Sequence, residues 1–435
     1  RKDAPLLIGY GEGCNFIASD VTALVRHTRD VAYMDDGEVA ILTAEGVTVL
    51  DAMEQPVVKE HHHIDWEISA AEKGGYPHFM FKEIMEEPEA IRRTVGPRLH
   101  EGKIVFEGLH LTPEELRGME RITIIACGSS YHVGVIGKYN LEKMTRIPVE
   151  VTLASEFRYA DPIVSEKTLV LVISQSGETA DSLAALRLAK KKGLKTLGIV
   201  NVVGSSIARE ADNVFYTLAG PEIAVATTKA YSTQLIAGYC LAVQFALVRG
   251  CISQGRYQDL ISQLQCLPEQ IQKILDDKER IQWFASKQVA AKNIFFIGRG
   301  IDYSISMEGS LKLKEISYIH SEAYAAGELK HGTISLITDN VPVIALATQP
   351  DVYAKIISNV QEVRSRGAKV ILITGADASV DAALCDYHIV LPETDPLFAP
   401  FVATVILQYL AYYVSVEKGL NVDQPRNLAK SVTVE

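Results

Sequence analysis

The sequence has 435 residues, of which 48% are hydrophobic and 22% are charged, as in a soluble globular protein of two or three domains. Its net charge of −11 argues against nucleic acid as the main partner, because a phosphate backbone demands a basic surface. Six scattered cysteines with no C-x-x-C pair argue against a disulfide framework or zinc knuckle and favour a reducing, cytoplasmic compartment.

We expect no membrane association, because no apolar run reaches the ~18 residues that span a bilayer. The sequence starts at Arg1 without a Met or a signal-peptide core, so we interpret it as a fragment or a processed product. The run His61-His62-His63 could ligate a metal, but no second cluster lies at ligand spacing. We therefore predict a polar linker there, and no metal or other cofactor.

Residues 1–65 alternate apolar and polar residues between turn signals. The stretch from Val31 to Leu42 around Asp36-Gly37 predicts a β-hairpin. This antiparallel piece is too short for a large core of its own. Residues 66–116 are helix-rich, most clearly from Glu67 onward, and we predict a helical linker.

From residue 117 apolar runs alternate with helical stretches, which predicts a first α/β domain over residues 117–250. The expected strands are Ile122–Ala126, Val149–Leu153, Leu169–Ile173, Thr196–Val200 and Val214–Leu218. Continuous apolar strands between helices are typical of a parallel sheet that is covered on both faces.

Residues 251–285 predict connecting helices, and the strand–helix rhythm then restarts over residues 286–420. Its expected strands are Asn293–Gly298, Val341–Leu346, Val370–Ile373 and Tyr387–Leu391. Both halves open with a strand, a glycine and a helix, at Gly128 and at Gly298. We predict two copies of one doubly wound domain.

The strongest local signal is the run from Ser174 to Thr179, between a buried strand and a helix. Free N–H groups and the helix dipole meet at such a strand end, and Gly177 allows close backbone approach. With the polar turn Gly128-Ser129-Ser130 after the first strand, this predicts a phosphate pocket. An ordinary helix N-cap explains the motif about equally well. The second half, at Thr348-Gln349-Pro350, lacks the hydroxyl cluster.

Two further segments hold candidate catalytic groups. Lys312 and Glu315 share a helix face, but spacing alone favours a surface salt bridge over a catalytic pair. His331 follows a stretch of small residues and glycines that suits a closely packed site. A lone histidine is nevertheless more often structural.

Four segments carry a family resemblance. The sequence resembles the glutamine:fructose-6-phosphate amidotransferases, or glucosamine-6-phosphate synthases, in segments 126–131, 174–181, 311–331 and 423–435. The resemblance implies an α/β fold of two tandem SIS (sugar isomerase) domains, preceded by an antiparallel remnant of a glutaminase domain. It also implies that residues 421–435 form an active-site tail.

The resemblance assigns a role to each matching position. Glu315 resembles the acid/base that moves a proton between sugar carbons 1 and 2. His331 resembles the ring-opening group, which the neighbouring subunit of a dimer supplies. Lys430 resembles the lysine that forms an imine with the ketose, and Lys312 lies where the family has a lysine near the reacting hydroxyls. The substrate- and phosphate-binding positions would be Cys127, Gly128, Ser129, Ser130, Ser174, Gln175, Ser176, Thr179, Ala226, Thr227 and Ala429.

The implied partners are fructose 6-phosphate, glucosamine 6-phosphate, ammonia from glutamine, and a second copy of the chain. The family's glutaminase nucleophile is an N-terminal cysteine, whereas Cys14 is internal here. We therefore expect the residues that hydrolyse glutamine to lie outside this sequence. An ammonia-independent fructose/glucose 6-phosphate isomerase and a non-catalytic phosphosugar sensor are the alternatives. The set Lys312, Glu315, His331 and Lys430 favours an enzyme.

Overall fold

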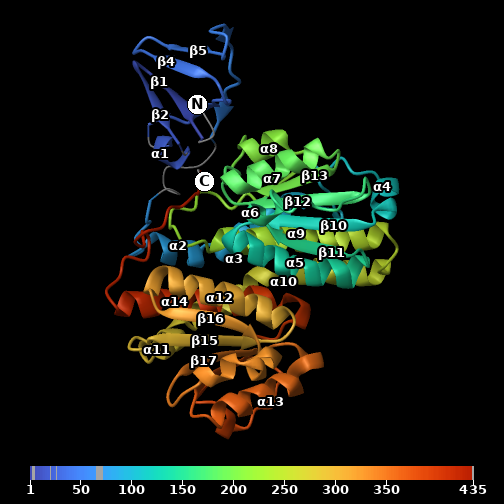
Figure 1. Ribbon diagram of the computed structural model, residues 1–435, viewed down its shortest axis with the longest axis vertical. Coiled ribbons are helices and arrows are strands. Elements are labelled where there is room, and N and C mark those ends of the chain that lie inside the picture. Colours follow the sequence, from blue (N-terminus) through green and yellow to red (C-terminus); the bar gives the residue numbers. More distant parts are fainter. Residues whose placement is uncertain (2–4, 20, 26, 65–71, 434–435) are drawn as a thin grey trace.

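The computed structural model describes residues 1, 5–19, 21–25, 27–64 and 72–433. Figure 1 shows three parts stacked along the long axis, which are a β-rich N-terminal part, a first α/β repeat and a second α/β repeat. The predicted boundary near residue 65 lies outside the described residues, as do Glu67 and the tail residues Val434 and Glu435.

The N-terminal part consists of two small antiparallel sheets, ordered β2-β1-β3-β7 and β4-β5-β6. Its elements are β1 (Leu7–Gly11), β2 (Cys14–Ala18), α1 (Val21–Leu24), β3 (Asp30–Tyr33), β4 (Val39–Leu42), β5 (Val47–Leu50), β6 (Pro56–Val57) and β7 (His62–His63). Ile8, Met34 and Val49 form a small buried cluster within this part.

Two predictions for this part are wrong. The strands of the predicted hairpin exist, but β3 pairs with β1 and β7, whereas β4 pairs with β5. The segment between them crosses from one sheet to the other, because Met34 is buried in the cluster with Ile8 and Val49. The predicted polar linker at His61–His63 includes the edge strand β7, where His63 Nδ1 lies 2.7 Å from Asp30 Oδ1.

Short elements connect this part to the repeats, and they are α2 (Phe79–Met85), α3 (Glu87–Val95), η2 (Gly96–Arg98), β8 (Leu99–His100), β9 (Lys103–Ile104) and α4 (Pro113–Gly118). Thr112 and Glu115 form a capping box at the start of α4. Helices α2 and α3 contact long helices of both repeats. They therefore bring their acidic side chains into the middle of the molecule.

The first repeat is a five-stranded parallel sheet ordered β11-β10-β12-β13-β14. Its elements are β10 (Arg121–Ala126), α5 (Gly128–Thr145), β11 (Val149–Leu153), α6 (Ala154–Phe157), β12 (Thr168–Ser174), α7 (Ala180–Lys191), β13 (Lys195–Val200), α8 (Ser206–Glu210), β14 (Asn213–Tyr216) and α9 (Lys229–Val248). All five predicted strands are present. Every residue of β12 is buried, as an apolar strand covered on both faces requires.

The second repeat follows α10 (Gln254–Asp276) and α11 (Lys278–Ser286) and has the same strand order, β16-β15-β17-β18-β19. Its elements are β15 (Asn293–Gly298), α12 (Ile301–Ser317), β16 (His320–Ala325), η3 (Ala326–His331), η4 (Thr333–Leu336), β17 (Pro342–Ala347), η5 (Pro350–Val352), α13 (Tyr353–Arg364), β18 (Lys369–Thr374), η6 (Ala382–Leu384), β19 (Tyr387–Val390), η7 (Pro396–Phe398) and α14 (Ala399–Glu417). The fold class and the repeat are as predicted, but β16 was missed because this edge strand begins with His320-Ser321-Glu322.

Long helices fill the space between the two sheets (Figure 1). Helix α5 packs on α9, α12 packs on α14, and α5 meets α12 across the boundary between the repeats. One hydrophobic core therefore extends through both repeats. The expectation that no stretch is long and apolar enough to cross a membrane was too strict. Segments Lys229–Val248 and Pro396–Glu417 are long and apolar enough. However, 78% and 94% of their most apolar windows are buried inside the protein, so they are weak evidence for membrane spans.

Candidate active site

The phosphate-loop candidate lies at the carboxyl ends of two neighbouring strands, β10 and β12. The chain leaves these strands toward opposite sides of the sheet, which is where doubly wound proteins bind ligands. Gly177 has φ +67°, and a Cβ there would lie 2.0 Å from Ser205 Oγ, so the tight turn requires glycine. Ser174 Oγ lies 3.1 Å from Thr179 Oγ1 and accepts the Gly177 N–H. The loop is thus a compact cluster of hydroxyls.

The C-terminal tail lies on this loop. Ser176 Oγ is 3.1 Å from Ser431 Oγ, and the Ala180 N–H at the start of α7 donates to the Val432 carbonyl at 3.1 Å. The Gln175 carbonyl accepts a hydrogen bond from the Asn201 N–H at 3.1 Å, which fixes the loop against the next strand. The predicted loop and the predicted tail are therefore in direct contact.

The two serines of the second predicted turn, after β10, bond to different helices. Ser130 Oγ donates to Gln234 Oε1 on α9 at 2.9 Å, and Ser129 Oγ donates to Glu308 Oε1 on α12 at 2.9 Å. Cys127 lies beside α7, and burial raises the pKa of its thiol. Gly128 begins α5 with φ +53°.

Helix α12 presents three ionisable residues at helical spacing toward α5. Lys312 Nζ lies 2.5 Å from Glu315 Oε2 and 3.5 Å from Glu308 Oε1. The Lys312 side chain is only 1% exposed, so the predicted surface salt bridge is instead a buried ion cluster. Burial lowers the pKa of Lys312, but the carboxylates of Glu315, Glu308 and, more weakly, Glu222 outweigh it and hold that pKa above its usual value.

Lys430 reaches from the tail into the loop that follows β14. Its Nζ donates to Glu222 Oε2 at 2.5 Å and to the Ala224 carbonyl at 2.8 Å. Ala226 and Thr227 lie in the same loop, just before α9, while Ala429 is exposed in the tail. The structure therefore brings Lys430 to the loop that contains the predicted 226–227 segment, through contacts with Glu222 and Ala224.

Of the predicted catalytic residues, His331 alone takes no part in these contacts within the described part of the chain. It is exposed at the end of η3, beyond the carboxyl end of β16 in the second repeat. In the part of the chain that the structure describes, it makes no hydrogen bond or ion pair with Glu315, Lys312 or Lys430.

Two contacts anchor the tail, one to the residue at the end of α12 in the second repeat and one to the connecting helix α2. The Arg426 N–H donates to the Tyr318 hydroxyl at 2.8 Å, and the Arg426 guanidinium lies 4.2 Å from the centre of that ring. Asp423 accepts the N–H groups of Phe79 and Met80 at 3.0 and 2.9 Å, so it caps α2. With the contacts of Ser431 and Val432 at the end of β12, the tail is held at both of its ends.

Several residues of this site were not predicted, chiefly Glu222, Glu308, His132 and Gln234. Glu222 stands alone in the apolar run Pro221-Glu222-Ile223-Ala224, and an isolated acid in a non-helical apolar run was a usable signal. Glu308 lies four residues before Lys312, on the same helix face. His132 Nδ1 lies 2.8 Å from Glu308 Oε2, a contact between repeats that spacing cannot reveal.

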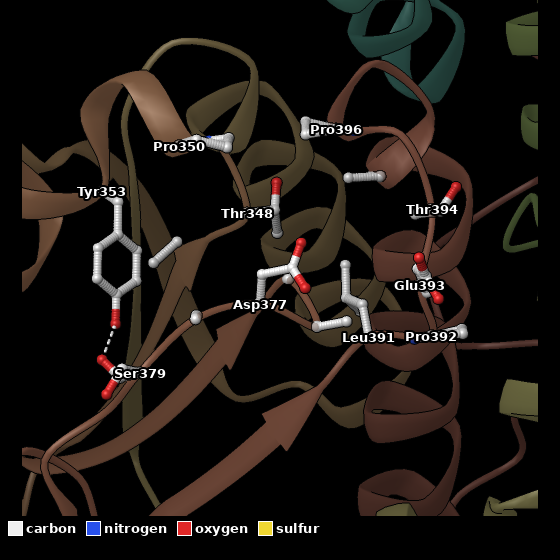
Figure 2. A pocket seen from close by; sticks show the side chains of 15 residues that line it. Thr348, Pro350, Tyr353, Asp377, Ser379, Leu391, Pro392, Glu393, Thr394 and Pro396 are labelled. Carbon is white, nitrogen blue, oxygen red and sulfur yellow. Dashed lines mark hydrogen bonds between the residues drawn. The ribbon is translucent and has the colours of Figure 1, made fainter.

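The second repeat has a cavity of about 310 Å³ at the carboxyl ends of β17, β18 and β19 (Figure 2). Thr348, Asp377 and Glu393 line it, and its lining includes no lysine, arginine or histidine. The Thr348 N–H and hydroxyl both donate to the buried Asp302 carboxylate, at 2.8 and 2.5 Å. The Thr348 hydroxyl is thus already hydrogen-bonded to a carboxylate.

The profile of the SIS domain family matches residues 115–244 and 289–418. The chain is 53% identical over its whole length to glutamine–fructose-6-phosphate aminotransferase [isomerizing] of Caldanaerobacter subterraneus subsp. tengcongensis, and 52% identical to that of Clostridium acetobutylicum. It spans 72% of the length of each relative.

Two solved structures share the architecture. The C-terminal domain of glucosamine-fructose-6-phosphate aminotransferase from Francisella tularensis has a TM-score of 0.78 and 38% identity, over 81% of this chain and 100% of that chain. Tagatose-6-phosphate ketose/aldose isomerase from Escherichia coli, at 20% identity and a TM-score of 0.67 over 80% of this chain and 95% of that chain, shares the fold alone. By its relatives and its two SIS domains, the chain belongs to the glutamine–fructose-6-phosphate aminotransferase [isomerizing] family.

Proposed function

We propose that this chain performs the sugar half of glucosamine 6-phosphate synthesis, in which fructose 6-phosphate and ammonia are the reactants. The observation that carries the proposal is the contact between the hydroxyl cluster of the Ser174–Thr179 loop and Ser431 of the tail, the residue that follows Lys430. The names of the relatives support the choice of sugar and nitrogen donor.

The phosphate binds in the first repeat, at Ser130, Ser174, Gln175, Ser176 and Thr179. The loop hydroxyls supply donors for a dianion, and the positive end of the α7 dipole favours it, although the Ala180 N–H already bonds to Val432. The corresponding end of the second repeat is unsuited to phosphate, because Asp302 occupies the donors of Thr348 and because Asp377 and Glu393 line the cavity beside it. The two repeats have therefore diverged, one for phosphate and the other for the α12 cluster.

The reaction starts with ring opening, since fructose 6-phosphate is mostly closed. His331 moves the proton for this step from the neighbouring subunit of a homodimer, which agrees with its exposure in its own chain. Lys430 then forms an imine at carbon 2, which makes the carbon 1 protons more acidic. Ammonia replaces Lys430 at carbon 2 and leaves the nitrogen on the sugar.

Glu315 completes the reaction by taking a proton from carbon 1 while carbon 2 receives one. Its side chain is 20% exposed, at the more open end of the α12 cluster and beside the Lys312 ammonium. That ammonium stabilises negative charge that develops on neighbouring sugar oxygens. In the whole protein the ammonia comes from glutamine, and the working compartment is the cytoplasm.

The decisive experiment incubates the chain with fructose 6-phosphate, with and without ammonium, and identifies the products by mass spectrometry. Glucosamine 6-phosphate that forms only with ammonium supports the proposal. Glucose 6-phosphate at equal rates in both reactions would identify an ammonia-independent isomerase instead. Binding of the sugar with no turnover in either reaction would identify a sensor.

A further inference from the structure

Glu222 is a buried carboxylate whose two oxygens have different tasks. Its Oε1 accepts the N–H groups of Thr228 and Ala230 at 2.9 and 3.0 Å, at the start of α9. Its Oε2 accepts Lys430 Nζ at 2.5 Å. Oε1 therefore holds the loop in place, and Oε2 binds Lys430 of the tail.

The charge state of this pair opposes the chemistry proposed for Lys430. Burial raises the pKa of Glu222, but the Lys430 ammonium and the two N–H groups outweigh it and hold that pKa below its usual value. At 2.5 Å between Nζ and Oε2, the two groups form a salt bridge of a carboxylate and an ammonium. An ammonium nitrogen has no lone pair and cannot attack a carbonyl, so Lys430 must lose a proton before it forms an imine.

Among the described residues, the ionisable groups that interact with Glu222 are Lys430 of the tail, Glu83 of α2, Glu87 of α3 and Lys312 of α12, and Lys229 of α9 interacts in turn with Glu83. Lys229 is already paired with Glu86 at 2.7 Å, and Lys312 with Glu315. In the described part of the chain, Glu222 is the only carboxylate within hydrogen-bonding distance of Lys430 Nζ.

Glu83 positions this loop. Its Oε1 accepts the N–H groups of Ile223 and Ala224 at 2.5 and 3.2 Å, directly after Glu222. Burial and the nearby Glu222 raise the pKa of Glu83 to about 8, so it is mostly neutral at pH 7. Asp423 of the tail caps helix α2. The tail therefore contacts α2, Glu83 of α2 contacts the loop after Glu222, and Glu222 contacts Lys430 of the tail.

We infer that Glu222 is the base that removes a proton from Lys430 and returns it when the imine forms, an inference that rests on the proposed function. The neutral amine attacks carbon 2 of the open-chain ketose, and a second nitrogen proton moves to the carbonyl oxygen to give a carbinolamine. Protonated Glu222 then gives its proton to that hydroxyl, which leaves as water while the nitrogen lone pair forms the C=N bond.

The step balances without any further reactant. The ammonium loses two protons and the ketose loses its oxygen, which together make one water, and the positive charge remains on the protonated imine. That imine faces the restored Glu222 carboxylate. The geometry suits this step, because Ser431 and Val432, the next two residues after Lys430, lie on the phosphate loop.

The test is borohydride trapping. Borohydride reduces the imine to a stable amine, so the rate of adduct formation between the chain and fructose 6-phosphate is measured by intact-protein mass spectrometry from pH 6 to 8. We expect the wild-type rate to change little with pH. In Glu222→Gln the rate at pH 7 should fall roughly 10²-fold or more and should rise by about tenfold per pH unit, because free base must now remove the proton.

The matched control is Glu87→Gln. Glu87 is as buried as Glu222 but bonds to Ser232 at 2.6 Å rather than to Lys430, so its variant should trap at the wild-type rate at pH 7. Glu222→Asp retains a carboxylate, so it should recover part of the rate and keep the flat pH dependence. If circular dichroism shows that Glu222→Gln does not fold, the Asp variant still tests the inference.

Wild-type-like trapping and pH dependence in folded Glu222→Gln would overturn the inference while leaving imine formation intact. A Glu222→Asp variant that is folded but shows a steep, Gln-like pH dependence would overturn it too. The absence of any adduct in the wild type would instead defeat the proposed imine, and with it the proposed function, so the two failures are distinguishable.

Discussion

The hydroxyl of Ser129 donates a 2.9 Å hydrogen bond to the Glu308 carboxylate, and this contact joins the two repeats of the chain. The Oε2 atom of the same carboxylate lies 2.8 Å from His132 Nδ1, and its Oε1 atom lies 3.5 Å from Lys312 Nζ. Burial raises the pKa of Glu308, but Lys312 and His132 outweigh it and hold that pKa below its usual value, so the residue is a buried anion at neutral pH. Ser129 therefore links the α5 turn to the α12 cluster.

Ser129→Ala should destabilise the chain by about 1–3 kcal/mol, the usual cost of removing a hydrogen bond to a buried charge. It should weaken fructose 6-phosphate binding less than Ser176→Ala does, because its hydroxyl is already engaged by Glu308. Urea unfolding and calorimetric titration measure the two effects, with the exposed Ser262→Ala as control. Equal losses of affinity in Ser129→Ala and Ser176→Ala would mean that Ser129 contacts the sugar.

Ser176→Ala should weaken fructose 6-phosphate binding by ~1–3 kcal/mol, because a charged phosphate loses one donor. Thr348→Ala, its counterpart in the second repeat, should leave affinity unchanged, since the Thr348 hydroxyl serves Asp302. Titration with the sugar phosphate checks both variants. Full affinity in Ser176→Ala together with a loss in Thr348→Ala would place the phosphate in the second repeat.

A third prediction concerns the pH dependence of stability through Glu87. Burial raises the pKa of Glu87 to about 8, against hydrogen bonds from Ser232 and Gln408 that lower it. The folded chain thus keeps a proton that the unfolded chain releases above about pH 4.5, so this residue's contribution to stability falls as the pH rises from there to about 8.

Glu87→Gln removes this loss, because the amide does not ionise. The stability of the variant relative to the wild type should rise by roughly 1–3 kcal/mol between pH 5.5 and pH 8.5. Urea unfolding at the two pH values measures the difference, and Glu89→Gln on the exposed face of the same helix is the control. Parallel pH dependences in Glu87→Gln and the wild type would show that Glu87 is ionised throughout.

The sheets were predictable from the sequence because central parallel strands are buried on both faces and read as apolar runs, as β12 does. Strand β16 was not predictable in this way, because an edge strand tolerates polar residues such as His320. The hairpin error has the same origin, since local alternation shows that β3 and β4 are strands but does not select their partners.

The site was predictable where a loop follows a strand, and where the family resemblance identified Lys430 in the tail. It was not predictable where function depends on burial. Lys312 and Glu315 have the spacing of a surface pair, and only the packing of α12 on α14 and α5 buries the lysine. Glu222 and Lys430 are 208 residues apart, a pairing that no local pattern contains.

We predict a homodimer with shared active sites. His331 is exposed in its own chain and has no hydrogen bond to the α12 cluster among the described residues, so we expect a second chain to bring its own His331 to the site. Neither His331→Ala nor Glu315→Gln should form product alone, but a mixture should recover about a quarter of the wild-type activity if subunits exchange and one of two sites in each mixed dimer is intact. Sedimentation of a fully active monomer would contradict this arrangement.

The last prediction concerns Glu315 itself. Its carboxylate lies 2.5 Å from Lys312 Nζ at the more open end of the cluster, and proton transfer at carbon needs such a positioned base. Glu315→Gln keeps the size and part of the hydrogen bonding but cannot accept the proton, so turnover should fall roughly 10²–10⁴-fold. Affinity for fructose 6-phosphate should change little, because the phosphate loop belongs to the other repeat. A large loss of turnover with intact binding is the signature of an interaction made mainly in the transition state.

Exchange of the carbon 1 hydrogen with deuterated water isolates this step from imine formation. The wild type should exchange during turnover, Glu315→Gln should exchange far more slowly, and Glu393→Gln, in the cavity of the second repeat (Figure 2), should match the wild type. Borohydride trapping of Lys430 should stay normal in Glu315→Gln, because imine formation precedes the transfer at carbon. If Glu315→Gln exchanges at the wild-type rate, another group is the base, and the pair with Lys312 serves only to hold α12 in place.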